Sequence, residues 1–213
     1  MSDAVLYGYF RSSAAYRVRI ALNLKGLSAD HRFIHLRKGE QTQDAYRKIN
    51  PAGLVPYWID DDLELAQSIA IIEYLDEVYP EPPLLPGGAA ARARVRQIAL
   101  SIACDIHPVN NLRIRQYLAN TLQIDAEASK TWYRHWIDLG FRGVEALLDA
   151  DGPFACGDAP TMADIVLVPQ VANARRFQIP LDAYPRIVRA DGAARALPAF
   201  AAAAPDVQPD FGL

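Results

Sequence analysis

The sequence has only two cysteines, Cys104 and Cys156, and neither lies in a CxxC pair or in the spacing of a metal site. We therefore expect buried free thiols, no disulfide and no metal. Long apolar runs are also missing, since none approaches the roughly 18 residues that span a bilayer. The start, Met1-Ser2-Asp3, lacks the cationic and apolar regions of a secretory signal. These absences predict a cytoplasmic protein without a membrane segment.

An excess of basic charge is absent as well. Lys and Arg number 22 against 25 Asp and Glu, which gives a net charge of −3. This balance offers no electrostatic reason to expect nucleic acid or an anionic membrane as a partner. The chain has enough hydrophobic residues to form a buried core, because they make up 51% of its 213 residues. That is enough for one large domain or two small ones.

Residues 1–80 alternate between strand and helix patterns. Strands are predicted at 4–9, 31–35, 56–59 and 62–65, and helices at 15–25, 41–48 and 67–79. The first two strands are joined by a helical crossover and should pair in parallel, whereas the acidic turn Asp60-Asp61-Asp62 suits an antiparallel hairpin. We therefore expect an α/β domain with a mixed four-stranded sheet.

The composition changes after this domain. Four prolines and two glycines fall between Tyr79 and Gly88, so residues 81–88 are predicted to form an interdomain linker. From 89 to 213 the sequence is rich in Ala, Leu, Ile and Arg at helical spacing and has little strand signal. A second, all-helical domain is predicted there.

Two hydroxyls, Ser12 and Ser13, lie where the first strand gives way to a helix that should end at Gly26. Hydroxyls and free N–H groups at the positive end of a helix stabilise an anion and can lower the pKa of a thiol. Serine is also a favoured N-cap whatever the function. From this segment alone, a structural cap and a thiolate site both remain open.

Two later residue pairs also have both a structural and a ligand-binding interpretation. Pro56 begins a strand, and a cis Val55-Pro56 bond would present the Val55 backbone to a peptide-like ligand, although cis is the minority form of an X-Pro bond. Gln67 and Ser68 place another hydroxyl at a helix start, where they could hold a carboxylate. Either pair alone would be a fold element in most proteins.

In this order and spacing, these residues resemble the glutathione transferase superfamily, whose thioredoxin-like N-terminal domain has a cis-proline and a Gln-Ser pair at its third helix. Ser12-Ser13 followed by Arg17-Val18-Arg19-Ile20-Ala21-Leu22 is similar to the zeta class, the maleylacetoacetate and maleylpyruvate isomerases. The similarity covers nearly the whole chain. It continues through Asn50-Pro51, the segment from Cys104 to Asn111, the capping box Thr161 to Asp164, and Arg175-Arg176-Phe177.

The resemblance implies a homodimer that uses glutathione to isomerise the cis double bond of a 4-oxo-alkenoate diacid. Maleylacetoacetate is preferred as the substrate and maleylpyruvate is the alternative. A general conjugating transferase and a non-catalytic binding protein are the competing functions. Paired arginines near the site argue against a conjugating transferase, because such an enzyme needs an open apolar pocket. The retained site residues argue against a non-catalytic binding protein.

The resemblance also implies which residues bind glutathione. Ser12 would be the principal hydroxyl donor to its thiolate, with Ser13 as support. The other predicted contacts are Gln67 and Ser68 for the glutamyl carboxylate, Val55 ahead of Pro56 for the cysteinyl backbone, and Gln41 for the glycyl end. Gln41 lies in a polar helix, where a solvated glutamine is nearly as good an explanation.

A substrate with two carboxylates requires arginines that can bind them. Arg11 and Arg176 are the preferred ligands. Asn111 is a further predicted substrate contact, and Arg113 and Arg115, which follow it, would extend the positive lining. Adjacent arginines point about 100° apart on a helix, so only one of Arg175 and Arg176 can face the site. His107 could contact the substrate or make a structural hydrogen bond.

One departure from the zeta pattern is Ala14-Ala15, where that class has Cys-Ser. The change removes a protein thiol from the centre, so the chemistry would depend on the sulfur of glutathione alone. Arg17 and Arg19 are expected to make structural salt bridges with acidic segments. Trp132 and Trp136, four residues apart, are expected to pack in the helical core.

Overall fold

The computed structural model describes residues 4–213, which divide into two compact units. Among the described residues, the first unit is 4–84 with Ala196–Leu213, and the second is Leu85–Arg195. In the described range no helix is long and apolar enough to cross a membrane. No cluster of three His, Cys, Asp or Glu side chains suited to a metal occurs there either.

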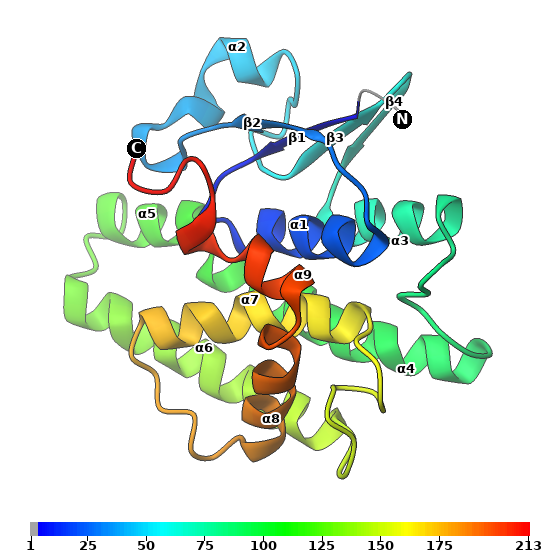
Figure 1. The fold of residues 1–213 in the computed structure, drawn as a ribbon. Helices are drawn as coiled ribbons and strands as arrows, with labels where there is room; N and C mark the ends of the chain where they lie inside the picture. The colour runs from blue at the N-terminus through cyan, green and yellow to red at the C-terminus, as the bar shows by residue number, and fades with distance from the viewer. Residues whose placement is uncertain (1–3) are drawn as a thin grey trace. The chain divides into compact units, whose positions relative to one another are not determined.

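The first unit is built on a four-stranded sheet (Figure 1). Its elements are β1 (Val5–Gly8), α1 (Ser13–Lys25), β2 (Asp30–Phe33), α2 (Asp44–Arg47), β3 (Tyr57–Asp60), β4 (Leu63–Ala66), α3 (Ser68–Val78) and α9 (Pro198–Ala203). The strand order is β2-β1-β3-β4, with β1 and β2 parallel and the other pairs antiparallel. The mixed sheet predicted from the crossover and the acidic turn is therefore confirmed.

Alternation along the strands gives this sheet two buried faces. Tyr7 of β1 and Tyr57 of β3 pack with Tyr46 of α2 in one apolar cluster. Leu6 and Trp58, which point the other way, are also buried. Figure 1 shows α2 on one side of the sheet and α1 with α3 on the other. The predicted helix at 41–48 is instead a short 3-10 turn, Glu40–Thr42, followed by α2.

The helix α1 is central to this unit, since it contacts both α3 and α9. It ends where expected, at Gly26, whose φ of 67° is the left-handed conformation that glycine adopts without strain. Two side chains of α1 bond to α9. Arg19 Nε donates to the Ala203 carbonyl at 3.1 Å, and Asn23 Nδ2 donates to the Ala199 carbonyl at 2.8 Å. The predicted division into 1–80 and 89–213 is therefore wrong at its C-terminal end, because Ala196–Leu213 returns to pack on α1.

The second unit is helical, as predicted for the sequence after the linker. It contains α4 (Ala89–Leu100), α5 (Leu112–Asn120), α6 (Ala126–Leu147), α7 (Met162–Arg176) and α8 (Pro185–Arg195). The capping box at the start of α7 is confirmed, with Asp164 Oδ2 accepting from the Thr161 N–H at 2.9 Å. Asp164 Oδ1 also accepts from the Ala155 N–H at 2.7 Å. Its burial raises the pKa of Asp164 from 3.8 to about 6.

A π-helical segment, Ser101–Ile106, continues α4 and packs against α6. The approach is close at Gly140, where an added Cβ would lie 2.2 Å from Ile106 Cγ1. Cys104 in this segment is exposed, so the prediction that it is buried is wrong. Cys156 is half-buried, and both thiols are free as expected.

The two tryptophans of α6 are also less buried than predicted. Trp132 and Trp136 are half-buried and in ring contact, with centroids 5.7 Å apart. Trp132 Nε1 donates to the Val109 carbonyl at 3.0 Å. This polar anchor keeps the indole at the margin of the unit, whereas Tyr133 and Ile137 occupy its core.

Candidate functional site

The register of the sheet brings three predicted segments of the first unit to one edge. Tyr7 near the end of β1 pairs with Tyr57 at the start of β3, and Tyr57 pairs in turn with Ala66 at the end of β4. The segments that continue from these strand ends are the turn to Ser12, the loop with Val55-Pro56, and Gln67-Ser68. Segments distant in sequence thus meet on one side of the unit.

Ser12 is the N-cap of α1, as its position predicted. Its backbone is extended, with φ −70° and ψ 116°, and its Oγ accepts from the Ala15 N–H at 3.2 Å. Accepting this bond uses a lone pair of the hydroxyl and leaves its hydrogen free to donate. The structural cap and the thiolate site are therefore compatible. Ser13, the first residue of α1, is buried.

Gln67 is the N-cap of α3 in a conformation that glycine would favour, with φ 72° and ψ 112°. Its exposed side chain makes no capping bond, so the amide is available to a ligand. Ser68 follows at the first helical position and is buried. Such strained backbone often marks a ligand site.

Arg17 adds positive charge behind this helix start. It is 2% exposed, and its Nη1 donates to Ser68 Oγ at 3.2 Å. The free N–H groups of the first turn of α3, the helix dipole and this guanidinium all favour a carboxylate there. Arg19 donates to the carbonyls of Ala203 and Phe10, and Asp210 is the acidic group whose charge acts on it, as the prediction of an acidic partner implied.

The Val55-Pro56 peptide bond is cis, as the resemblance implied. The carbonyl before it, Leu54 O, accepts from the Tyr46 hydroxyl at 2.6 Å and from Asn50 Nδ2 at 2.8 Å, which fixes the loop. The backbone N–H and carbonyl of Val55 bond to none of the residues 4–213. They are therefore free to pair with a peptide-like ligand.

Gln41 lies beside the same loop. An added Cβ on Gly53, which has φ 61°, would stand 2.8 Å from the Gln41 carbonyl, so the two loops touch. Gln41 is half-buried, and its side-chain Oε1 is buried without a hydrogen-bond partner among the described residues. A buried amide oxygen without a donor favours a ligand contact over the solvated alternative.

Some of the residues predicted to bind a diacid have no contact that marks them as ligands. Asn111 is the N-cap of α5, accepting from the Arg113 N–H at 3.2 Å, and the Arg113 side chain is exposed. His107 is half-buried between the π-helical segment and Pro108. Arg11, in the first unit, is exposed with its guanidinium 5.0 Å from the Phe10 ring centre.

Arg176 belongs to a more organised group. Its guanidinium lies 4.8 Å from the Phe177 ring centre, and its Nη2 donates to Asn173 Oδ1 at 3.1 Å. Its neighbour Arg175 is bound to the buried Asp191 at 2.6 Å. The helix therefore separates the two arginines as expected, and Arg175 is the structural one.

Arg115 joins this group, and Arg113 does not. Its guanidinium lies 4.8 Å from the Phe177 ring centre and 5.7 Å from that of Tyr133, whose rings stand 3.8 Å apart. Burial raises the pKa of Tyr133 despite the opposing charges of Arg176 and Arg115. Two guanidiniums thus lie against one aromatic pair, a suitable arrangement for an anion.

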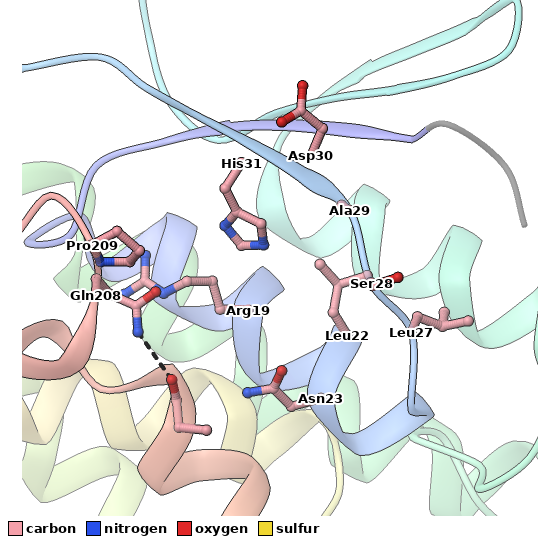
Figure 2. Close-up of a pocket in the computed structure, with 11 residues that line it drawn as sticks. Arg19, Leu22, Asn23, Leu27, Ser28, Ala29, Asp30, His31, Gln208 and Pro209 are labelled. Carbon is pink, nitrogen blue, oxygen red and sulfur yellow. Dashed lines mark hydrogen bonds between the residues drawn. The ribbon is translucent and has the colours of Figure 1, made fainter.

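A hollow of about 400 Å³ elsewhere in the first unit contains none of these residues. It is bounded by α1, the segment before β2 and the C-terminal tail, with Arg19, His31 and Gln208 in its lining (Figure 2). The predicted site is instead a set of backbone and side-chain groups along the sheet edge.

Two family models match the sequence. They are the glutathione S-transferase N-terminal domain, over residues 2–77, and the glutathione S-transferase C-terminal domain, over residues 130–203. A probable maleylacetoacetate isomerase of Vibrio cholerae is 51% identical, and the match covers 99% of each chain.

Solved structures agree. A maleylpyruvate isomerase, described as a bacterial zeta-class glutathione S-transferase, has a TM-score of 0.93 and 48% identity over 97% of this chain and 99% of its own. The maleylacetoacetate isomerase of Methylobacterium extorquens AM1, solved with malonate and glutathione, has a TM-score of 0.93 and 39% identity over 96% and 98%. Similarity this extensive, in sequence and in structure and over both units, shows that the chain belongs to the zeta class of the glutathione S-transferase family.

Proposed function

We propose that this protein is a glutathione-dependent cis–trans isomerase of a 4-oxo-alkenoate diacid, with maleylacetoacetate preferred and maleylpyruvate the alternative. The observation that carries the proposal is the Ser12 hydroxyl, which caps α1 while keeping its hydrogen free for a thiolate. The relatives are named for both substrates, and both substrates carry two carboxylates.

The residues along the sheet edge fit glutathione. The start of α3, with Gln67, Ser68 and the Arg17 charge behind it, would hold the glutamyl carboxylate. The free backbone of Val55 would pair with the cysteinyl residue, and the unpartnered Gln41 Oε1 would accept from the glycyl N–H. Bound glutathione supplies a thiolate that adds to the conjugated cis double bond and leaves after the single bond has rotated.

This chain's own residues prepare that thiolate. The Ser12 hydroxyl donates to it, with Ser13 as support, and the positive end of α1 favours its negative charge. No acidic side chain lies in the first turn of α1 to oppose this effect. Ala14 and Ala15 contribute no thiol, so the nucleophile comes from glutathione alone.

Arginines bind the substrate in this proposal. Arg176 and Arg115 would hold a carboxylate against the Tyr133 and Phe177 rings, and Arg11 stays a predicted carboxylate contact of the first unit. Arg113, Asn111 and His107 stay predicted contacts. Cationic groups of this kind also stabilise the negative charge that develops on the oxo group when the thiolate adds.

The enzyme works as a cytoplasmic homodimer in this proposal, as the family resemblance implies. A conjugating transferase is the second candidate, since the same thiolate could attack other electrophiles. The arginine and aromatic group in the second unit favours a diacid over an apolar electrophile.

The test is the rate of isomerisation of maleylpyruvate and of maleylacetone, a stand-in for maleylacetoacetate, with and without glutathione. We expect turnover only with glutathione, and the ratio of the two rates identifies the preferred substrate. Absence of turnover with both substrates, together with conjugation of an aryl halide, would favour the transferase.

A further inference from the structure

Phe10 lies two residues before Ser12 and is held by the C-terminal tail, Ala196–Leu213. Its N–H donates to Asp210 Oδ2 at 2.8 Å, and its ring meets the Phe211 ring edge-on with centroids 5.5 Å apart. The residues are 200 positions apart in the chain, yet the contact is buried, with Phe10 and Asp210 each 4% exposed. The tail thus holds both the backbone and the ring of Phe10.

Arg19 connects the same residue to the body of the tail. Its Nη2 donates to the Phe10 carbonyl and its Nε to the Ala203 carbonyl, each at 3.1 Å. Figure 2 shows Gln208 and Pro209 beside this guanidinium, and Gln208 Nε2 donates to the Ala202 carbonyl at 3.0 Å. These hydrogen bonds hold the tail in place just before Asp210.

A second contact reaches the same turn. The Leu213 carbonyl is 3.0 Å from His35 Nε2, and the His35 ring lies tilted beside the Tyr9 ring with centroids 5.2 Å apart. The Tyr9 carbonyl in turn accepts from the Ser12 N–H at 2.9 Å. Phe10 therefore contacts the tail directly, and Tyr9 is linked to it through His35.

The chemistry of Asp210 indicates more than chain anchoring. A buried carboxylate is costly to desolvate, and Asp210 Oδ1 accepts no hydrogen bond from any of residues 4–213. The positive charge of Arg19 compensates part of this cost. A tail that served only to cover α1 could use an apolar residue here, whereas a carboxylate fixes the Phe10 N–H in one direction.

We propose that Asp210, assisted by Phe211, is a positioning residue that holds the turn before α1 so that the Ser12 hydroxyl points at the thiol of glutathione. This inference rests on the proposed function of Ser12. Asp210 acts through Phe10 and touches neither glutathione nor substrate.

The experiment compares Asp210→Ala, Asp210→Asn and the wild type at a temperature where each is folded. The readouts are kcat, KM for glutathione, and the pKa of the bound thiol from the ultraviolet absorbance of its thiolate. In Asp210→Ala we expect kcat to fall by about tenfold, because a hydroxyl displaced by a fraction of an ångström donates poorly. The bound-thiol pKa should rise, while KM stays within about twofold because the tripeptide contacts lie elsewhere.

Asp210→Asn keeps an acceptor for the Phe10 N–H and should restore most of kcat and the low thiol pKa. Val207→Ala, at a 60% exposed position of the same tail, is the control and should match the wild type. An unchanged bound-thiol pKa in folded Asp210→Ala would overturn the inference. If that variant does not fold, Phe211→Ala decides, since Phe211 is 53% exposed, and an unchanged thiol pKa there would equally overturn it.

The thiol pKa is measured without substrate, so this test is separate from that of the proposed function. A wild type that turns over neither diacid would contradict the isomerase. A thiol pKa that ignores the tail would contradict the positioning role alone.

Discussion

Arg17 Nη1 donates to Ser68 Oγ at 3.2 Å and so joins the interior of α1 to the start of α3. The bond places a buried guanidinium directly behind the helix N-terminus proposed to hold the glutamyl carboxylate. Arg17, a residue of the zeta-like motif, therefore supports the proposed site from a buried position.

Arg17→Leu should therefore weaken glutathione binding. Loss of the charge and of the bond that orients Ser68 should cost about 1–2 kcal/mol, or roughly tenfold in Kd measured by calorimetry. Arg32→Leu is the matched control, because Arg32 is an exposed arginine of the same unit paired with Asp30 at 3.0 Å. Equal affinities in the two variants would refute a role for Arg17.

Gln67→Gly should separate stability from binding. Glycine relieves the cost of a φ of 72°, so the free energy of unfolding should rise by up to about 1 kcal/mol after the larger backbone entropy of glycine is counted. The amide that contacts glutathione is lost at the same time, so Kd should increase. Denaturant titration and calorimetry measure the two effects, and a variant that is both less stable and fully able to bind would contradict the argument.

Gly140→Ala should destabilise the second unit, since its Cβ would lie 2.2 Å from Ile106. Overpacking of this kind costs about 1–3 kcal/mol. Gly143→Ala on the same helix is the control, because nothing lies within 4 Å of an added Cβ there, and alanine should stabilise α6 slightly. Thermal melting compares the two. Gly140→Ala should cost less in an Ile106→Ala background, because that change removes the two side-chain atoms within 2.4 Å of the added Cβ.

Asp164 makes stability depend on pH. Its pKa is raised from 3.8 to about 6 in the folded state, so between these values the folded protein binds the extra proton. The contribution of Asp164 to the free energy of unfolding is therefore highest at low pH and falls as pH rises from about 4 to 6, by an amount on the order of 3 kcal/mol. Urea titrations of the wild type and Asp164→Asn should show a difference that changes with pH in this window, and a constant difference would contradict the assignment.

The N-terminal unit was largely predictable because its signals are local. Gly26 ends α1, the acidic turn after Asp60 reverses the chain, and a serine at Ser12 caps a helix, each through the chemistry of a few adjacent residues. The return of the tail to α1 was missed, since the bond between Phe10 and Asp210 joins residues with no neighbouring pattern to signal it.

The errors in the second unit have a different physical cause. The π-helical segment Ser101–Ile106 shifts the phase of the helix, so a period of 3.6 residues could not tell that Cys104 is exposed. Whether Arg113 or Arg115 meets the aromatic pair depends on the rotation of α5, which starts only at Leu112. The type of residue was predictable there, but its orientation was not.

The most direct measurement is the pH titration of the thiolate absorbance of glutathione bound to the wild type and to Ser12→Ala, with Ser28→Ala at an exposed position as the control. If Ser12 holds the thiolate, the wild type and the control titrate well below the pKa of a free thiol, about 8.5, and Ser12→Ala titrates near it. If bound glutathione in Ser12→Ala titrates at the wild-type pH, the hydroxyl does not stabilise the thiolate and the central claim is wrong.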